Sequence, residues 1–208
     1  LERKNGKYET ANNSPFDLLN TAFADSGMCI VVEKDFQVEI PIRILFFSNG
    51  ERSIMVNPRI NIDVEESSSL TFIEHHVGNA ASFFQNESVF ISLGNNGQLN
   101  HIRIQSNSEF TQNMANVNVI QASDSCYDFF QLVTGGKLSR SNICVQLNGE
   151  NAQCNINSLA LSKNNQHIDN NIIVNHNSPQ THSTQFVKSI LFDISTGVFN
   201  GRTVVHEN

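Results

Sequence analysis

The sequence predicts an all-β fold, a right-handed parallel β-helix with two strands per rung and a short N-terminal capping helix. Two observations indicate it. Short polar turns start at residues 65, 94, 122, 148 and 177, so successive starts lie 26 to 29 residues apart. Each turn lies between two runs in which apolar and polar residues alternate, as half-buried strands require. A fixed period of this length is typical of solenoids and is too short for the four strands of a propeller blade.

The first predicted element is a helix that begins near Pro15. Ser14 is a suitable N-cap, proline suits the first helical position, and the carboxylate of Asp17 would meet the positive end of the helix dipole. The apolar residues expected on one face are Phe16, Leu19 and Phe23. Because the ends of a solenoid expose apolar surface and free strand edges, we expect this helix to cover the open end of the coil.

The predicted strands follow as pairs around the turns. The apolar positions expected to face inward are Ile60, Ile62 and Val64 before Leu70 and Phe72; Val89, Ile91 and Leu93 before Ile102 and Ile104; Val117 and Val119 before Tyr127 and Phe129; and Ile143, Val145 and Leu147 before Cys154 and Ile156. The rung spacing also predicts one buried column, formed by Ile62, Ile91, Val119, Val145 and Ile173. Asparagine, present at 29 positions, suits left-handed turns and bonds between rungs, although an AT-rich genome would raise its count equally.

Domain boundaries follow from the same pattern. We expect an N-terminal segment with the capping helix at residues 1–27 and the β-helix core at residues 28–208. The next tight turn is due at residues 206–208, so the coil is expected to be truncated there and to continue in further rungs. The chain starts at Leu1 rather than methionine, so any targeting segment would lie outside it.

Composition narrows the range of functions. With 39% hydrophobic and 16% charged residues, the chain is expected to form one elongated folded domain. A net charge of -7 and scattered basic residues argue against a nucleic-acid partner. No apolar run approaches the length of a membrane span, so no membrane partner is expected.

The spacing of the four cysteines argues against a metal site and against disulfides. They are Cys29, Cys126, Cys144 and Cys154. None forms a CxxC or CxxH pair, and the scattered spacing argues against disulfides. Cys154 is in phase with Ile156 and is expected in the core. Cys144 is out of phase with its apolar neighbours and is expected to face outward, where a thiol could hold sulfur or iron transiently, although a structural role is favoured for every cysteine.

Metal-binding and catalytic patterns are also lacking. Only His75 and His76 are adjacent among the histidines, and neighbours on a strand point to opposite faces. A pectinolytic β-helix would need acids at one recurring rung position, which Asp124, Asp128, Asp169 and Asp193 do not share. Leucine follows Gly135-Gly136-Lys137, so no phosphate-binding loop is formed. We assign no catalytic, cofactor-binding or metal-binding residue and expect the chain not to be an enzyme.

One segment resembles a known family. From His167 to Arg202 the chain reads HIDNNIIVNHNSPQTHSTQFVKSILFDISTGVFNGR. Its pattern of Asp169, His176, Pro179, Ser183, Gln185 and Lys188, followed by GVFNGR, is similar to the core shared by the SufB and SufD proteins of iron-sulfur cluster assembly. The segments RSNICVQLNGE, NPRINIDVEESSSLTFIEHHVG and FDLLNTAF extend the resemblance over most of the chain, and the last of these favours the SufD branch.

This resemblance implies a scaffold subunit that supports cluster assembly and iron acquisition. Its implied partners are a SufB-like protein and a SufC-like ATPase, with a homodimer as a further arrangement, in the cytoplasm or in a plastid. It implies no resident cofactor in this chain, and an iron-sulfur cluster only transiently in the full complex. Asp169 and His176 look like recurrent family positions, for which hydrogen bonding between rungs is the favoured role. In SufB proteins, polar side chains inside the coil are thought to form a sulfur route; Gln185, Lys188 and Arg202 occupy polar positions of late rungs here. The alternative function is that of a carbohydrate-active or adhesive β-helix.

Overall fold

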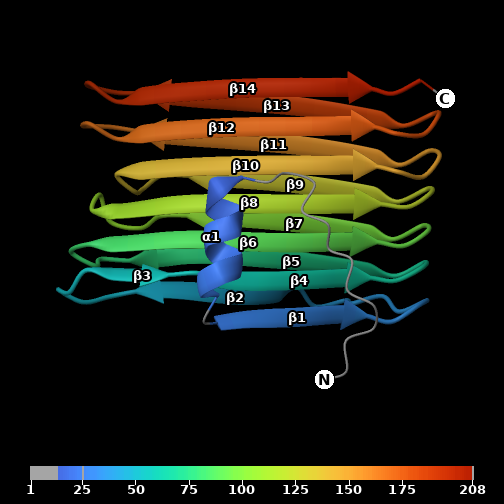
Figure 1. Cartoon of the computed structure of the whole chain (residues 1–208), viewed down its shortest axis with the longest axis horizontal. Helices are drawn as coiled ribbons and strands as arrows, with labels where there is room; N and C mark the ends of the chain where they lie inside the picture. Colours follow the sequence, from blue (N-terminus) through green and yellow to red (C-terminus); the bar gives the residue numbers. More distant parts are fainter. Residues whose placement is uncertain (1–13, 25, 208) are drawn as a thin grey trace.

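The computed structural model describes residues 14–24 and 26–207 and confirms the predicted parallel β-helix. Two parallel sheets lie one behind the other (Figure 1). The first sheet consists of β1 (Ser26–Val32), β4 (Pro58–Val64), β6 (Phe83–Leu93), β8 (Thr111–Gln121), β10 (Leu138–Leu147), β12 (His167–His176) and β14 (Thr196–Val205), with β3 (Ile54–Val56) paired to β6. The second consists of β2 (Ile42–Ser48), β5 (Ser69–Gly78), β7 (Gln98–Gln105), β9 (Cys126–Val133), β11 (Gln153–Ser162) and β13 (His182–Leu191).

Tight turns join the two sheets at the predicted positions. Each of the five turns holds one residue in the left-handed region, with φ between 56° and 59°: Ser67, Asn96, Asp124, Asn151 and Gln180. The backbone N–H of such a residue donates to a carbonyl of the next turn, as from Asn96 to Ser123 at 2.9 Å and from Asp124 to Glu150 at 2.9 Å. These bonds stack the turns into a column, and Asn96 and Asn151 confirm that asparagine serves as a left-handed turn residue here.

The apolar core is the predicted column with one correction. Ile62, Ile91, Val119 and Val145 pair in register across successive strands and are fully or almost fully buried. The fifth member is Val174, which pairs with Val145; Ile173 was predicted wrongly, because it pairs with Cys144 on the outer face. Residues 172–174 are all apolar, so alternation does not set the phase there. The phase is set instead by the 29-residue interval between the turns at 148 and 177, which leads from Val145 to Val174.

β7 has the opposite phase from the one expected. Its inward-facing residues are Leu99, His101, Arg103 and Gln105, all buried. Ile102 and Ile104 are only half-buried and point outward, so the prediction that they face the core was wrong. Leu99 sets the phase because it pairs with Leu70 beside the turn, and the two-residue period then carries polar side chains inward.

The N-terminal helix α1 (Pro15–Phe23) is present, but it does not cover the open end of the coil. It lies across the outer face of the first sheet, against β6 and β8 (Figure 1). Polar residues anchor it: the Asn20 amide donates to the carbonyls of Pro58 at 3.0 Å and Asn86 at 2.8 Å, and Ser88 Oγ donates to Asp17 at 2.6 Å. The expected apolar face is incomplete, because Phe23 is exposed.

The interior of the coil has an apolar half and a polar half. The apolar half lies next to the tight turns. The polar half lies at the other end of the strands, and its buried inward-facing side chains include Glu74, His76, Gln85, Glu87, Arg103, Gln105, Asn113, Gln131, Ser139, Ser141, Ser158 and Asn170. Hydrogen bonds link several of them between rungs, including Ser141 to Gln131 at 2.9 Å and Gln131 to Asn170 at 3.1 Å. Such bonding is what makes buried polar groups tolerable.

Candidate functional site

The strongest concentration of charge lies inside this polar half. Glu74 and His76 face inward from the end of β5, Glu87 faces inward from the start of β6, and Arg103 extends from β7. We call these four residues the buried charge cluster. A short return joins β5 to β6, which brings the carboxyl end of one strand close to the amino end of the next. All four side chains have at most 1% of their surface exposed.

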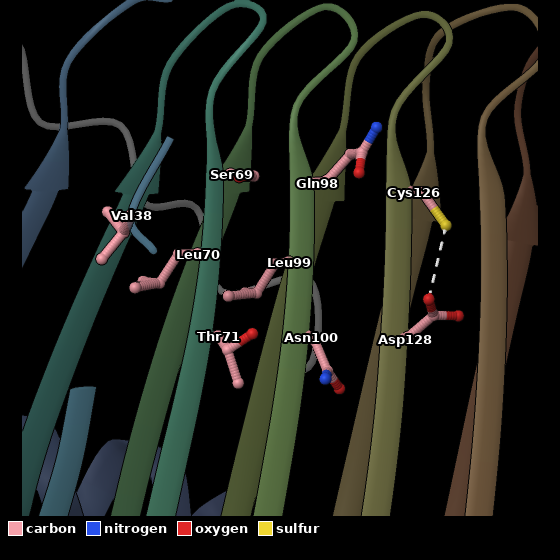
Figure 2. Close-up of a pocket in the computed structure, with 9 residues that line it drawn as sticks. All are labelled: Val38, Ser69, Leu70, Thr71, Gln98, Leu99, Asn100, Cys126 and Asp128. Carbon is pink, nitrogen blue, oxygen red and sulfur yellow. Dashed lines mark hydrogen bonds between the residues drawn. The ribbon is translucent and has the colours of Figure 1, made fainter. Parts of the chain in front are cut away.

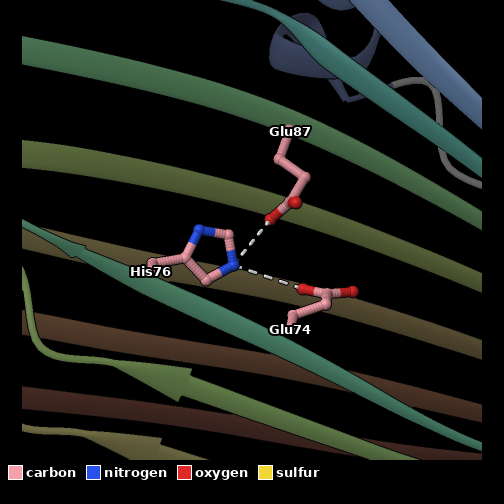
Figure 3. A group of neighbouring side chains, drawn as sticks. All are labelled: Glu74, His76 and Glu87. Atoms are coloured by element: carbon pink, nitrogen blue, oxygen red, sulfur yellow. Dashed lines mark hydrogen bonds and ion pairs between the residues drawn. The ribbon is translucent and has the colours of Figure 1, made fainter. Parts of the chain in front are cut away.

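The cluster centres on one imidazole nitrogen and two carboxylates. His76 Nε2 lies 3.4 Å from Glu74 Oε2 and 3.6 Å from Glu87 Oε2, as Figure 3 shows. Arg103 spans the same two oxygens: Nη2 donates to Glu87 Oε2 at 2.9 Å, and Nε lies 3.3 Å from Glu74 Oε2. Glu87 Oε1 is buried and has no hydrogen-bond partner. One imidazole nitrogen and two carboxylate oxygens thus lie around one small volume.

Neighbouring side chains orient these groups. His101 Nε2 lies 2.8 Å from the second oxygen of Glu74, and His101 Nδ1 lies 2.9 Å from the Tyr127 hydroxyl. The Gln85 amide lies 3.0 Å from His76 Nδ1. The Phe46 ring stacks on the His76 imidazole with centroids 4.6 Å apart and planes 4° apart. The His76 imidazole and the Glu74 carboxylate are therefore fixed by side chains outside the cluster.

The cluster has more carboxylates than permanent positive charges. Glu74 and Glu87 bring two carboxylates, whereas Arg103 brings one permanent cation. Burial alone would raise the pKa of Glu74, but His101, His76 and Arg103 together hold it below its usual range. Burial and the neighbouring charge of Glu74 raise the pKa of Glu87. Because an uncompensated buried charge is costly, the site favours a bound proton or a bound cation.

The cysteines do not form a site. Cys154 lies in the core as predicted, with no exposed surface. Cys144 lies on the outer face of β10 as expected, but it is buried there and cannot present its thiol to solvent. Its sulfur accepts a hydrogen bond from Gln146 at 3.5 Å. Burial raises the pKa of both thiols. Thiolate reactivity requires the opposite shift, so neither sulfur is activated.

A shallow surface pocket holds the third cysteine. Figure 2 shows Cys126 above Asp128 on the outer face of β9, beside residues of β5 and β7 such as Ser69 and Gln98. Cys126 Sγ lies 3.8 Å from Asp128 Oδ2. Burial raises the pKa of this thiol, and the Asp128 carboxylate raises it further. This shift is opposite to the one that activates a thiol as a nucleophile.

The remaining family positions are dispersed. Asp169 pairs with Arg140 of the preceding rung at 3.2 Å, which confirms its expected role between rungs. His176 does not have that role, because its ring bonds to Thr181 at 2.7 Å and to Ser183 at 2.9 Å within its own rung.

The three polar residues of late rungs do not come together. Gln185 follows the inward phase, since it pairs with Ile156. Lys188 and Arg202 are exposed and lie on different sheets. They form no common site with Gln185.

Sequence reasoning missed the buried charge cluster, although a signal for it was present. Leu70 and Leu99 lie at equivalent positions in successive rungs. Counting by two from each leads to Glu74 and His76 on one strand and to Arg103 on the next. The apolar pattern of Ile102 and Ile104 concealed this phase. The expected opposite orientation of His75 and His76 is confirmed, since only His76 is fully buried.

Comparison with known proteins identifies the family. Residues 46–208 match the family model described as SUF system FeS cluster assembly, SufBD core domain. The chain belongs to the SufB/SufD family. Its relatives include the iron-sulfur cluster assembly protein SufD of Escherichia coli, at 30% identity over 88% of this chain and 44% of the relative. They also include the SufB protein of Bacillus subtilis, at 27% identity over 86% of this chain and 38% of the relative.

One relative is a plant protein whose name places it in the chloroplast. The chain is 29% identical to the protein ABCI7, chloroplastic, of Arabidopsis thaliana over 90% of this chain and 42% of the relative. The chain thus spans less than half the length of these SufB/SufD family relatives. Within the described residues, the one helix is too short to span a membrane. Membership of this family favours iron-sulfur cluster assembly over the alternative of a carbohydrate-active or adhesive β-helix.

Proposed function

We propose that this chain forms the β-helical scaffold of a SufD-type subunit, which assembles with a SufB-like protein and a SufC-like ATPase and supports iron acquisition. The match of residues 46–208 to the SufBD core is the observation that carries the proposal. The 30% identity to a SufD protein favours the SufD branch. We infer a location in the cytoplasm, or in a plastid if the source is eukaryotic, and the name of the Arabidopsis relative supports the second option.

The thiols and the buried charge cluster of this chain suit a scaffold better than a catalyst. Two of the four thiols are buried with raised pKa values, and a third lies beside a carboxylate that raises its pKa. The buried charge cluster has almost no surface exposed to a substrate. These features support a subunit that contributes shape and contacts rather than a reactive group of its own.

Strand pairing at the sheet edges is the contact that we propose for assembly. Both sheets of the coil are parallel ladders, and a strand of a partner can be added to such a ladder where it ends. An edge strand offers unpaired N–H and C=O groups to a partner, and apolar neighbours add area to such a contact.

Co-expression tests the proposal. The tagged protein, produced together with SufB-like and SufC-like proteins of the same organism, should retain both partners through affinity purification and gel filtration. It should also restore iron-sulfur enzyme activity and normal iron content in a SufD-deficient bacterial strain. Retention of neither partner, together with failure to restore growth, would reject the scaffold assignment.

A variant without the accessible cysteines tests whether a thiol of this chain takes part in chemistry. The triple variant Cys29→Ser, Cys126→Ser, Cys144→Ala should retain partners and restore activity as well as the wild-type protein does. If this variant assembled normally but failed to restore activity, a thiol of this chain would take part in chemistry, and the non-enzymatic part of the proposal would be wrong.

A further inference from the structure

We propose that Glu74, His76 and Glu87 form a binding site for one divalent transition-metal ion inside the coil. The site lies among buried side chains of β5 and β6, away from the cysteines and from the exposed strand edges. The inference rests on the geometry and chemistry of these side chains and does not depend on the proposed scaffold function.

The spacing of the three donors fits a metal ion. Tetrahedral ions hold nitrogen and oxygen ligands at about 2.0 to 2.2 Å, which places the ligand atoms about 3.4 Å from one another. His76 Nε2 lies 3.4 Å from Glu74 Oε2 and 3.6 Å from Glu87 Oε2. In the absence of an ion the 3.4 Å contact is a long hydrogen bond, because such bonds are usually about 2.9 to 3.0 Å. The two separations from His76 Nε2, drawn in Figure 3, thus match those around an ion, and the donor atoms all lie within 4.8 Å of one another.

An unsatisfied oxygen is a second indication. Glu87 Oε1, the other oxygen of the carboxylate that lies beside His76, is fully buried and has no hydrogen-bond partner. Leaving such an acceptor unpaired is costly, and a cation bound by both oxygens of the Glu87 carboxylate would remove that cost. One imidazole with two carboxylates is a donor set that suits zinc, iron, cobalt and manganese.

The surrounding residues meet the needs of a ligand set. Ligands of metal sites are oriented by further hydrogen bonds. His101 bonds to Glu74 at 2.8 Å, and Phe46 stacks on His76. The amide nitrogen of Gln85 lies 3.0 Å from His76 Nδ1. When the Gln85 amide group is flipped, its oxygen accepts a hydrogen bond from Nδ1–H, which leaves Nε2 unprotonated and free to bind the ion.

Arg103 sets the strength of the site. Its guanidinium contacts the same two oxygens, at 2.9 Å and 3.3 Å, and compensates one of the two negative charges. A divalent ion must bind beside this cation or displace it, which lowers the affinity. Removal of the Arg103 charge should therefore strengthen metal binding, whereas loss of any donor should weaken it. Because the donors are buried, ions should enter and leave slowly.

Metal retention tests the site directly. The protein is produced in medium containing Zn²⁺ or Co²⁺, washed with a chelator that removes ions from surface histidines, and analysed by elemental mass spectrometry. We expect about one ion per chain in the wild type and at least about a tenfold loss in Glu87→Gln and His76→Gln. The matched control His75→Gln changes the adjacent, outward-facing histidine and should retain the ion. A wild type that retains no ion, or a Glu87→Gln protein that retains as much as the wild type, would overturn the proposal.

Two further measurements keep the test decisive if a donor variant fails to fold. X-ray absorption on the Zn²⁺-loaded wild type should show nitrogen and oxygen ligands at about 2.0 to 2.1 Å and no sulfur; sulfur ligands would place the ion at the cysteines and refute the site. Folded Arg103→Met should retain at least as much ion as the wild type. If that variant retained less ion than the wild type, Arg103 would not compete with a metal ion for these carboxylates, and the proposed site would be wrong.

Discussion

Truncation of Val145 to alanine tests the stacked core. Val145 is fully buried and pairs with Val119 on one side and Val174 on the other. The substitution removes the equivalent of two methylene groups, worth about 1.6 kcal/mol of transfer free energy. A residual cavity of about 40 Å³ would add about 1 kcal/mol. We therefore expect the free energy of unfolding to fall by about 2 to 3 kcal/mol.

Urea denaturation monitored by circular dichroism measures this loss. The matched control is Val198→Ala in β14, where 47% of the side chain is exposed, and its effect should stay below about 0.5 kcal/mol. Val174→Ala should resemble Val145→Ala, whereas Ile173→Ala should cost less because Ile173 lies on the outer face. If Val145→Ala cost no more than the control, the column would not be the core. A changed slope with denaturant would instead indicate that the rungs no longer unfold together.

Three further predictions concern other parts of the coil. Burial raises the pKa of Asp17, so this carboxyl binds a proton more tightly in the folded protein than in the unfolded chain. The free energy of unfolding of the wild type minus that of Asp17→Asn should therefore fall as pH rises from about 4. A difference that does not change with pH would contradict this. Gly149→Ala would place a methyl group 1.9 Å from a backbone nitrogen of the preceding turn, so thermal denaturation should show a loss of about 1 to 3 kcal/mol. Iodoacetamide should modify exposed Cys29 much faster than buried Cys144 under native conditions, as peptide mass spectrometry would show, and equal rates would refute the burial of Cys144.

The sequence predicted the coil because its strongest signals are local. Turn residues at a fixed interval, such as Asn96 and Asn151, report on backbone conformation directly, and the period then determines the architecture. Cys154 was placed correctly for the same reason, because its neighbours alternate cleanly. These features need no knowledge of which segments meet in space.

The errors arose where two patterns competed. Ile102 and Ile104 form an apolar alternation on the wrong face, and only the pairing of Leu99 with Leu70 reveals the true phase. The position of α1 depends on hydrogen bonds from Asn20 to distant strands, which no local pattern encodes. The charge cluster was missed because it joins Glu74 and His76 of β5 to Glu87 of β6 and Arg103 of β7.

The phase of β7 has a consequence for folding fidelity. A slip of one residue would turn Ile102 and Ile104 into the coil and expel Arg103, so hydrophobicity alone would favour the wrong arrangement. That arrangement would leave Glu74 and Glu87 facing each other in the interior without their cation, at a cost of several kcal/mol. The two carboxylates therefore disfavour the shifted alignment of β7 and help to specify the observed one.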